Sequence, residues 1–102
     1  MRLINPKVLE QFWLTRRDAE KPLTRWYQTA KQAEWHSPNE LRNTFAYADP
    51  VPISKDKTAT VFNIGGNKYR LITVIHYKDQ AIIIKEVLTH QEYDTGNWKR
   101  KL

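Results

Sequence analysis

The chain is organised around residues 60–94, which read TVFNIGGNKYRLITVIHYKDQAIIIKEVLTHQEYD. Three runs rich in β-branched and aromatic side chains, which suit a pleated and packed surface, are separated by two short polar connections. The first connection, residues 65–67, reads Gly-Gly-Asn and favours a β-hairpin, because both residue types tolerate the positive φ angles of a tight turn. The second connection, residues 78–80, is short enough to return the chain antiparallel. This stretch therefore predicts a three-stranded antiparallel meander.

The second of these strands is predicted to lie at the centre of the sheet. Its apolar residues between positions 71 and 75 occupy both faces, as in a strand that is covered on both sides. Its start is polar, because Lys68, Tyr69 and Arg70 follow the turn directly. The third strand runs out at the same end of the sheet into residues 89–94. We therefore expect a functional site at this end, with Arg70 on a polar surface where its removal costs little core packing.

Two helices are predicted before the meander, after a very short strand at residues 3–4. Asn5 followed by a proline is typical of a helix start, with asparagine as N-cap and proline in the first helical position. Pro22 disfavours helical geometry in the residue before it, so this first helix is expected to end or kink near Glu20. Apolar residues at helical spacing then predict a second amphipathic helix over residues 23–33.

A short third helix is predicted at residues 41–45. Ser37 is its expected N-cap, and Glu40 is expected to reach back in a capping box. Residues 46–59 contain two prolines and no clear period, so they are expected to form a connection from the helices to the sheet. The order of short strand, two or three helices and three-stranded meander predicts an α+β fold with helices packed on a mostly antiparallel sheet.

Length and composition limit the possible classes of protein. A chain of 102 residues is expected to form one domain, residues 1–102, with a single core. It contains no cysteine, which excludes a disulfide framework and a zinc–thiolate site. No signal peptide or membrane-spanning run is recognisable, so a cytoplasmic protein is expected, without a membrane partner. The net charge of +6 favours a polyanionic partner, nucleic acid first, although an ordinary basic surface also explains it.

The polar end of the predicted sheet carries residues suited to RNA cleavage. RNA is cut without a metal when a base activates the 2′-hydroxyl, cations stabilise the phosphorane and an acid protonates the leaving oxygen. His90 can act as base or acid near neutral pH, and Tyr93 can donate or orient a proton. Arg70 and Lys68 can hold phosphate. If residues 89–94 continue as a helical turn, His90 and Tyr93 share one face. Three scattered histidines do not predict a metal site, and no cofactor is expected.

Structural interpretations of the same residues remain open. The Gly-Gly-Asn segment is a turn in the first place, and His90 can be an ordinary surface histidine. Tyr93 can close the core, and Asp94 can cap a turn or pair with Lys85. The tail contains Trp98, Lys99 and Arg100, which could stack on a base and grip phosphate, or could simply fray. The tryptophans at positions 13, 26 and 35 are interpreted as core or as a partner surface.

Two motifs together resemble the HigB toxin family of bacterial toxin–antitoxin systems. They are VFNIGGNKYRLI at residues 61–72 and THQEYD at residues 89–94. The resemblance extends from about residue 57 to residue 99. It implies a RelE-like fold and an endoribonuclease that cuts mRNA on the ribosome. It also implies a helix-turn-helix antitoxin, HigA-like, through which alone the toxin would meet DNA. The site residues that it implies are Asn67, Tyr69, Arg70, His90, Tyr93 and Asp94.

Two functions are therefore weighed. The first is a metal-independent endoribonuclease toxin. Its predicted catalytic residues are Arg70, His90 and Tyr93, and its predicted RNA-binding residues are Asn67, Lys68, Tyr69, Lys85, Asp94, Trp98, Lys99 and Arg100. The second is a non-catalytic RNA- or protein-binding module of the same fold, in which the cations only bind the partner. The choice of His90 or Tyr93 as base or acid stays open in the first hypothesis.

Overall fold

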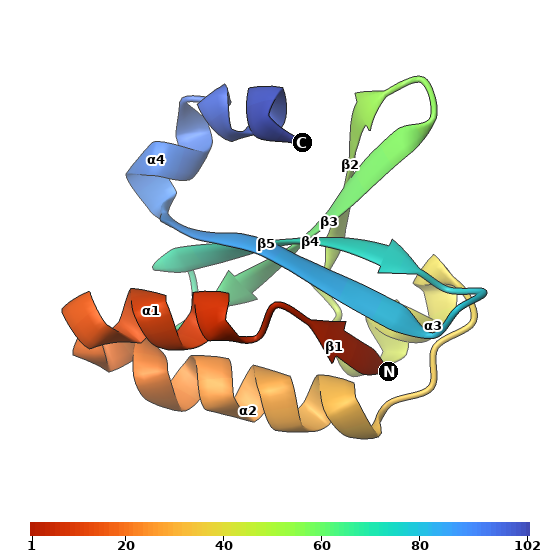
Figure 1. Ribbon diagram of the computed structural model, residues 1–102, viewed down its shortest axis with the longest axis horizontal. Helices are drawn as coiled ribbons and strands as arrows, with labels where there is room; N and C mark the ends of the chain where they lie inside the picture. Colours follow the sequence, from red (N-terminus) through yellow and green to blue (C-terminus); the bar gives the residue numbers. More distant parts are fainter.

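A five-stranded sheet in the order β1–β5–β4–β3–β2 forms the centre of the structure, a computed structural model that describes residues 1–102 (Figure 1). In chain order the elements are β1 (Arg2–Ile4), α1 (Lys7–Thr15), the 3-10 helix η1 (Arg17–Ala19), α2 (Glu20–Gln32), α3 (Pro38–Thr44), β2 (Asp49–Ser54), β3 (Lys57–Ile64), β4 (Tyr69–His76), β5 (Ala81–Thr89), α4 (His90–Asp94) and the 3-10 helix η2 (Asn97–Lys101). Helices α1 and α2 cover one face of the sheet (Figure 1). We call the other face, on which α4 and η2 lie, the open face.

The predicted meander is confirmed. Strands β3 and β4 pair antiparallel, as do β4 and β5, while β1 adds a parallel strand beside β5. Gly65 and Gly66, between β3 and β4, have φ angles of 63° and 70°, which explains glycine at both positions. Four α-helices, two 3-10 helices and a mixed sheet make the fold α+β, as the order of elements predicts.

The prediction that residues 46–59 form an irregular connection was wrong. Residues Asp49–Ser54 form β2, an edge strand that pairs antiparallel with β3. Pro50 and Pro52 led to the error, since proline cannot donate a ladder hydrogen bond. On an edge strand the loss of this donor costs nothing at a position whose N–H would point away from the partner strand. Residues 50 and 52 are two apart along the strand, so their backbone nitrogens point to the same side.

The predicted helix boundaries near Pro22 were also wrong. Helix α1 ends at Thr15, and η1 joins it to α2, which begins at Glu20 and contains Pro22 in its first turn. Proline is tolerated there because the first N–H groups of a helix have no intrahelical acceptor.

The predicted cap of α3 is confirmed in part. Ser37 Oγ accepts a hydrogen bond from the N–H of Glu40 at 3.3 Å, as the capping pattern predicts. The Glu40 carboxylate, however, accepts from the N–H of His36 at 2.9 Å, one residue before the cap. Helix α3 begins at Pro38, not at residue 41, because proline fits the first helical position.

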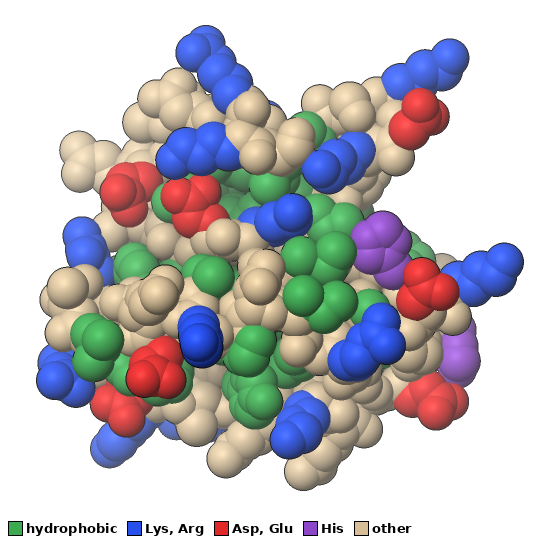
Figure 2. Space-filling view, in the orientation of Figure 1, with side chains coloured by type: hydrophobic (Ala, Val, Ile, Leu, Met, Phe, Trp, Pro, Cys, Tyr) green, Lys and Arg blue, Asp and Glu red, His purple; other side chains and the backbone are tan.

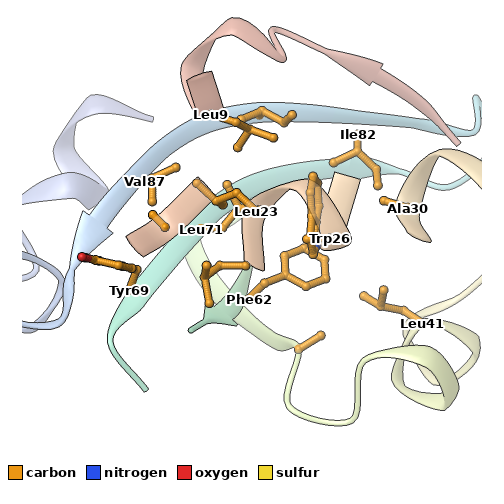
Figure 3. Packing of buried hydrophobic residues seen from close by; sticks show 14 of the residues in the cluster. Leu9, Leu23, Trp26, Ala30, Leu41, Phe62, Tyr69, Leu71, Ile82 and Val87 are labelled. Carbon is orange, nitrogen blue, oxygen red and sulfur yellow. The ribbon is translucent and has the colours of Figure 1, made fainter. Parts of the chain in front are cut away.

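The sheet is packed on both faces. The larger apolar cluster lies between the helices and the sheet and includes Leu23, Trp26, Phe62 and Leu71 (Figure 3). A smaller cluster on the open face contains Ile72 and four other residues: Ala59, Val61, Leu88 and Trp98. Neighbouring β4 residues therefore belong to different clusters, which confirms that β4 is covered on both sides. The tail is not frayed, since η2 packs Trp98 onto the open face.

Candidate active site on the open face of the sheet

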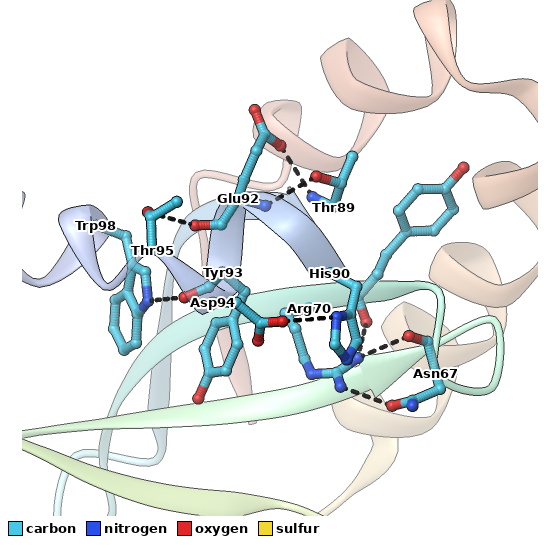
Figure 4. Close-up of polar contacts among 10 residues, drawn as sticks. Asn67, Arg70, Thr89, His90, Glu92, Tyr93, Asp94, Thr95 and Trp98 are labelled. Carbon is cyan, nitrogen blue, oxygen red and sulfur yellow. Dashed lines mark hydrogen bonds and ion pairs between the residues drawn. The ribbon is translucent and has the colours of Figure 1, made fainter.

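Helix α4 begins where β5 ends, and a capping box fixes that point. The N–H of Glu92 donates to Thr89 Oγ1 at 3.1 Å, and the N–H of Thr89 donates to Glu92 Oε1 at 2.9 Å (Figure 4). The bond from the Thr89 amide lowers the pKa of Glu92 below its usual range. The helical turn places His90 and Tyr93 at positions i and i+3, so the prediction that they share a face is confirmed.

The same turn of helix is tied to the β3–β4 connection. The N–H of His90 donates to the carbonyl of Lys68 at 3.1 Å. The start of α4 is therefore held by two sets of bonds, the capping box between Thr89 and Glu92 and the bond from the His90 N–H to the turn. The two motifs that are twenty residues or so apart in sequence meet at this bond.

Arg70 is buried, and the expectation that it lies on a polar surface was wrong. Its side chain is 9% exposed. Nη1 donates to the carbonyls of Asn67 and Tyr69 at 3.1 and 3.2 Å, and Nη2 donates to Asn67 Oδ1 at 2.6 Å (Figure 4). The guanidinium carbon lies 5.6 Å from the centre of the Tyr93 ring. These contacts fix a cation in one place and leave two of its five N–H donors for another acceptor.

His90 is oriented by Asp94. His90 Nδ1 lies 3.0 Å from Asp94 Oδ2, and both side chains are about half exposed. Asp94 thus pairs with the histidine on its own helix and not with Lys85. A carboxylate that accepts from Nδ1–H sets the ring so that Nε2 is free and can accept a proton. The sequence left this role for Asp94 unassigned.

Tyr93 lies between the arginine and the C-terminal segment. Its ring stacks on Trp98 with centroids 5.3 Å apart, and Trp98 Nε1 donates to the Tyr93 carbonyl at 3.2 Å. Burial raises the pKa of Tyr93, as do the nearby carboxylates of Asp49 and Asp94, while Arg70 opposes them. The phenol therefore stays protonated at neutral pH and can donate its proton. Asp49, at the start of β2, was missed because the prolines that follow it concealed the strand.

Lys68 and Tyr69 lie away from this group, although they were predicted to bind RNA. The Tyr69 side chain is 5% exposed and its hydroxyl donates to Asp18 Oδ1 at 2.7 Å. Lys68 forms an ion pair with the same carboxylate. Successive side chains on a strand point to opposite faces, so Tyr69 belongs to the helix side while Arg70 belongs to the open face. Asp18 was missed, because nothing in the local sequence marks it.

The predicted RNA-binding residues of the tail are split by burial. Trp98 is 3% exposed, so its indole is not open to stack on a base, contrary to that expectation. Lys99 and Arg100 are exposed on η2. Lys85 lines a hollow of ≈ 530 Å³ on the open face, together with Lys57, His76 and five further residues: Asp56, Thr58, Val74, Ile75 and Ile83. Figure 2 shows lysine and arginine side chains on the rim of the notch beside the β2–β3 hairpin and hydrophobic side chains on its floor.

No three or more histidine, aspartate or glutamate side chains gather where they could hold a metal ion. No helix is long and apolar enough to cross a membrane. What the open face offers is a fixed guanidinium, an imidazole oriented by a carboxylate and a protonated phenol within one small area.

Comparison with known proteins points in the same direction. A family described as HigB_toxin, the RelE-like toxic component of a toxin–antitoxin system, matches residues 19–96. The mRNA interferase toxin HigB of Escherichia coli K12 is 47% identical over 34 residues, which are a third of this chain and a third of that protein. The mRNA interferase HigB of Escherichia coli O6:H1 is 29% identical over 68 residues, or 67% of this chain and 64% of that protein.

Proposed function

The chain belongs to the HigB family of RelE-like toxins, and we propose that it is the endoribonuclease toxin of a toxin–antitoxin system, which cuts mRNA. The observation that carries the proposal is the buried guanidinium of Arg70, which is fixed by Asn67 on the open face beside Tyr93. A buried cation with free donors suits an oxyanion that develops during the reaction. The neighbouring pair of His90 and Asp94 suits proton transfer.

The proposed reaction is attack of a 2′-hydroxyl on the adjacent phosphate. His90 Nε2 takes the proton of the hydroxyl, and the oxygen forms a bond to phosphorus. Arg70 stabilises the negative charge on the phosphorane. Tyr93 gives its proton to the 5′-oxygen as the phosphorus–oxygen bond breaks, so the products are a 2′,3′-cyclic phosphate and a 5′-hydroxyl. This division of labour is supported by the Asp94 contact, which leaves Nε2 as an acceptor, and by the contact of the protonated Tyr93 phenol with Arg70.

RNA would reach this site across exposed cations. Lys85 lines the hollow on the open face, and Lys99 and Arg100 are exposed on η2 above it. Cations that hold phosphates position the strand without reading its bases. We propose that the substrate is mRNA on the ribosome, that the toxin acts in the cytoplasm and that it needs no metal or other cofactor.

The antitoxin is proposed to be a HigA-like helix-turn-helix protein, and the toxin would meet DNA only through it. It would inhibit by covering the basic end of the sheet or the helices that carry tryptophan. Trp13, on α1, lines a second hollow of ≈ 250 Å³ between α1 and α2, which offers such a surface.

The test is induced expression followed by mapping of RNA 5′ ends. The wild-type chain is expected to arrest growth and to produce new ends inside translated reading frames. His90→Ala is the matched variant, since His90 is half exposed and lies outside both apolar clusters. Growth arrest without new RNA ends would favour the alternative, a non-catalytic RNA- or protein-binding module of the same fold.

A further inference from the structure

We propose that Asp18, on η1, is a positioning residue for the RNA-cutting site, because it clamps the β3–β4 turn in the conformation that places Arg70 and His90. The inference rests on the proposed function for its catalytic part. The clamp itself is a structural claim that can be tested without RNA.

The clamp consists of two contacts to one carboxylate. Asp18 Oδ1 accepts from the hydroxyl of Tyr69 at 2.7 Å, and Oδ2 pairs with the ammonium of Lys68. Both contacts join residues about fifty positions apart in the sequence. The bonds from Lys68 and Tyr69 also lower the pKa of Asp18. The 3-10 helix between α1 and α2 is thereby joined to the first residues of β4.

The turn that precedes these residues is packed at one glycine and open at the other. Gly65 and Gly66 have positive φ angles; a Cβ at Gly65 would lie within 4 Å of Pro22, Lys68 and Tyr69, whereas a Cβ at Gly66 would meet nothing within 4 Å. Glycine in such positions has more conformational freedom than any other residue. The contacts of Lys68 and Tyr69 with Asp18, just after the turn, therefore help to fix its position.

Two hydrogen-bonding routes lead from the clamped segment to the site. The carbonyl of Lys68 accepts from the N–H of His90 at 3.1 Å. Asn67, the preceding residue, accepts from Arg70 through its carbonyl and its side chain at 3.1 and 2.6 Å. A shift of the turn would therefore move the proposed base and the proposed cation together, although Asp18 lies on the other side of the sheet.

Stability alone does not explain this arrangement. The side chains of Lys68 and Asp18 are 61% and 45% exposed, and exposed ion pairs contribute little to folding. Positioning has a different scale, since displacing a catalytic group by about 1 Å can lower a rate by about a hundredfold. Loss of the ion pair is therefore expected to affect cutting more than melting, whereas loss of the hydrogen bond to the buried Tyr69 hydroxyl also lowers the melting temperature.

The experiment compares Asp18→Ala with Asp18→Asn, with Tyr69→Phe and with the control Asp79→Ala. Asn keeps an oxygen acceptor for Tyr69, and Phe keeps the ring that packs edge-on to Phe12 at 5.1 Å. Asp79 is exposed in the turn between β4 and β5, away from the site. The readouts are amide hydrogen exchange of His90, the single-turnover cutting rate at saturating RNA, the KM for RNA and the melting temperature.

Asp18→Ala is expected to speed exchange of the His90 amide about tenfold, because the turn that holds its acceptor is released. The cutting rate is expected to fall about tenfold with KM within about twofold, because binding and positioning are separate contributions. Tyr69→Phe should share this pattern, Asp18→Asn should recover part of the rate, and Asp79→Ala should change nothing.

Unchanged His90 exchange in both Asp18→Ala and Tyr69→Phe would overturn the clamp. Faster exchange with a normal cutting rate would overturn the positioning role. If the wild-type chain cut no RNA at all, the proposed function would fail, and the exchange measurement would still decide whether Asp18 holds the turn.

Discussion

Replacing Arg70 by alanine separates the cost to the fold from the cost to the reaction. The substitution removes the three hydrogen bonds to Asn67 and Tyr69 and the contact with the Tyr93 ring. A hydrogen bond from a charged donor contributes about 1.5–3 kcal/mol to stability. Because the Asn67 side chain is exposed, water can bind there in the variant and recover part of the lost hydrogen-bond energy. The contact with the ring adds about 0.5–1 kcal/mol.

We therefore expect Arg70→Ala to lower the free energy of unfolding by roughly 2–3 kcal/mol. In a domain of this size that lowers the melting temperature by roughly 8–24 °C, since about 1 kcal/mol corresponds to 4–8 °C. The rate should fall by about two to three decades, because a fixed donor aimed at a developing oxyanion contributes about 3–4 kcal/mol to catalysis. Arg70→Lys keeps the charge but cannot form the planar fork, so it should restore stability better than it restores rate.

Cutting is measured at a temperature well below the melting point of the variant, so that the folded fraction does not limit the rate. Arg25→Ala is the matched control, since Arg25 is an exposed arginine on α2, on the helix side of the sheet. A normal cutting rate in folded Arg70→Ala would show that the guanidinium stabilises the fold and takes no part in the reaction.

Three further predictions concern the ion requirement, the cap of α4 and the β3–β4 turn. EDTA should leave cutting unchanged wherever any ribosomes in the assay stay intact; loss of cutting that one divalent ion restores would contradict the mechanism. The Thr89 amide lowers the pKa of Glu92, so the ionised carboxylate stabilises α4 at pH values above the ordinary pKa of glutamate, about 4.3. This stabilisation is lost as the pH falls through the lower pKa of Glu92 in the folded chain. The protection factor of the Thr89 amide, its intrinsic exchange rate divided by the observed rate, should therefore fall only below that range, and a fall near neutral pH would show that the capping box does not hold it. Gly66→Val should cost about 1–3 kcal/mol because Gly66 has a φ of 70°, and an unchanged melting temperature would show that the turn relaxes without strain.

Local signals in the sequence carry part of the site. A helical turn over residues 89–94 was only the condition under which His90 and Tyr93 share a face, and the Thr89-x-x-Glu92 capping box that starts this turn is a local pattern that went unrecognised. The Gly-Gly-Asn connection predicted the hairpin that brings the start of β4 beside that turn. Such features depend on residues within a few positions of one another, so they can be recognised in a single sequence.

Features that depend on distant contacts were missed. The burial of Arg70 follows from the folding of Tyr93 and Asn67 around it, and strand position alone does not reveal it. Asp18 meets its partners across fifty residues, and no local pattern marks such a contact. Strand β2 was hidden by its prolines, which are excluded from central strands but tolerated on the edge, and the edge is defined only once the sheet is assembled.

The proposed function requires that this chain cut RNA through the 2′-hydroxyl of the nucleotide before the broken bond. The decisive experiment uses an RNA with one mapped cut site, presented free or on the ribosome, and a second RNA with a single 2′-deoxy nucleotide at that position. We expect a 2′,3′-cyclic phosphate and a 5′-hydroxyl from the first RNA and no cut at that position in the second. Cutting of the 2′-deoxy RNA at the same position would show that the 2′-hydroxyl is not the nucleophile.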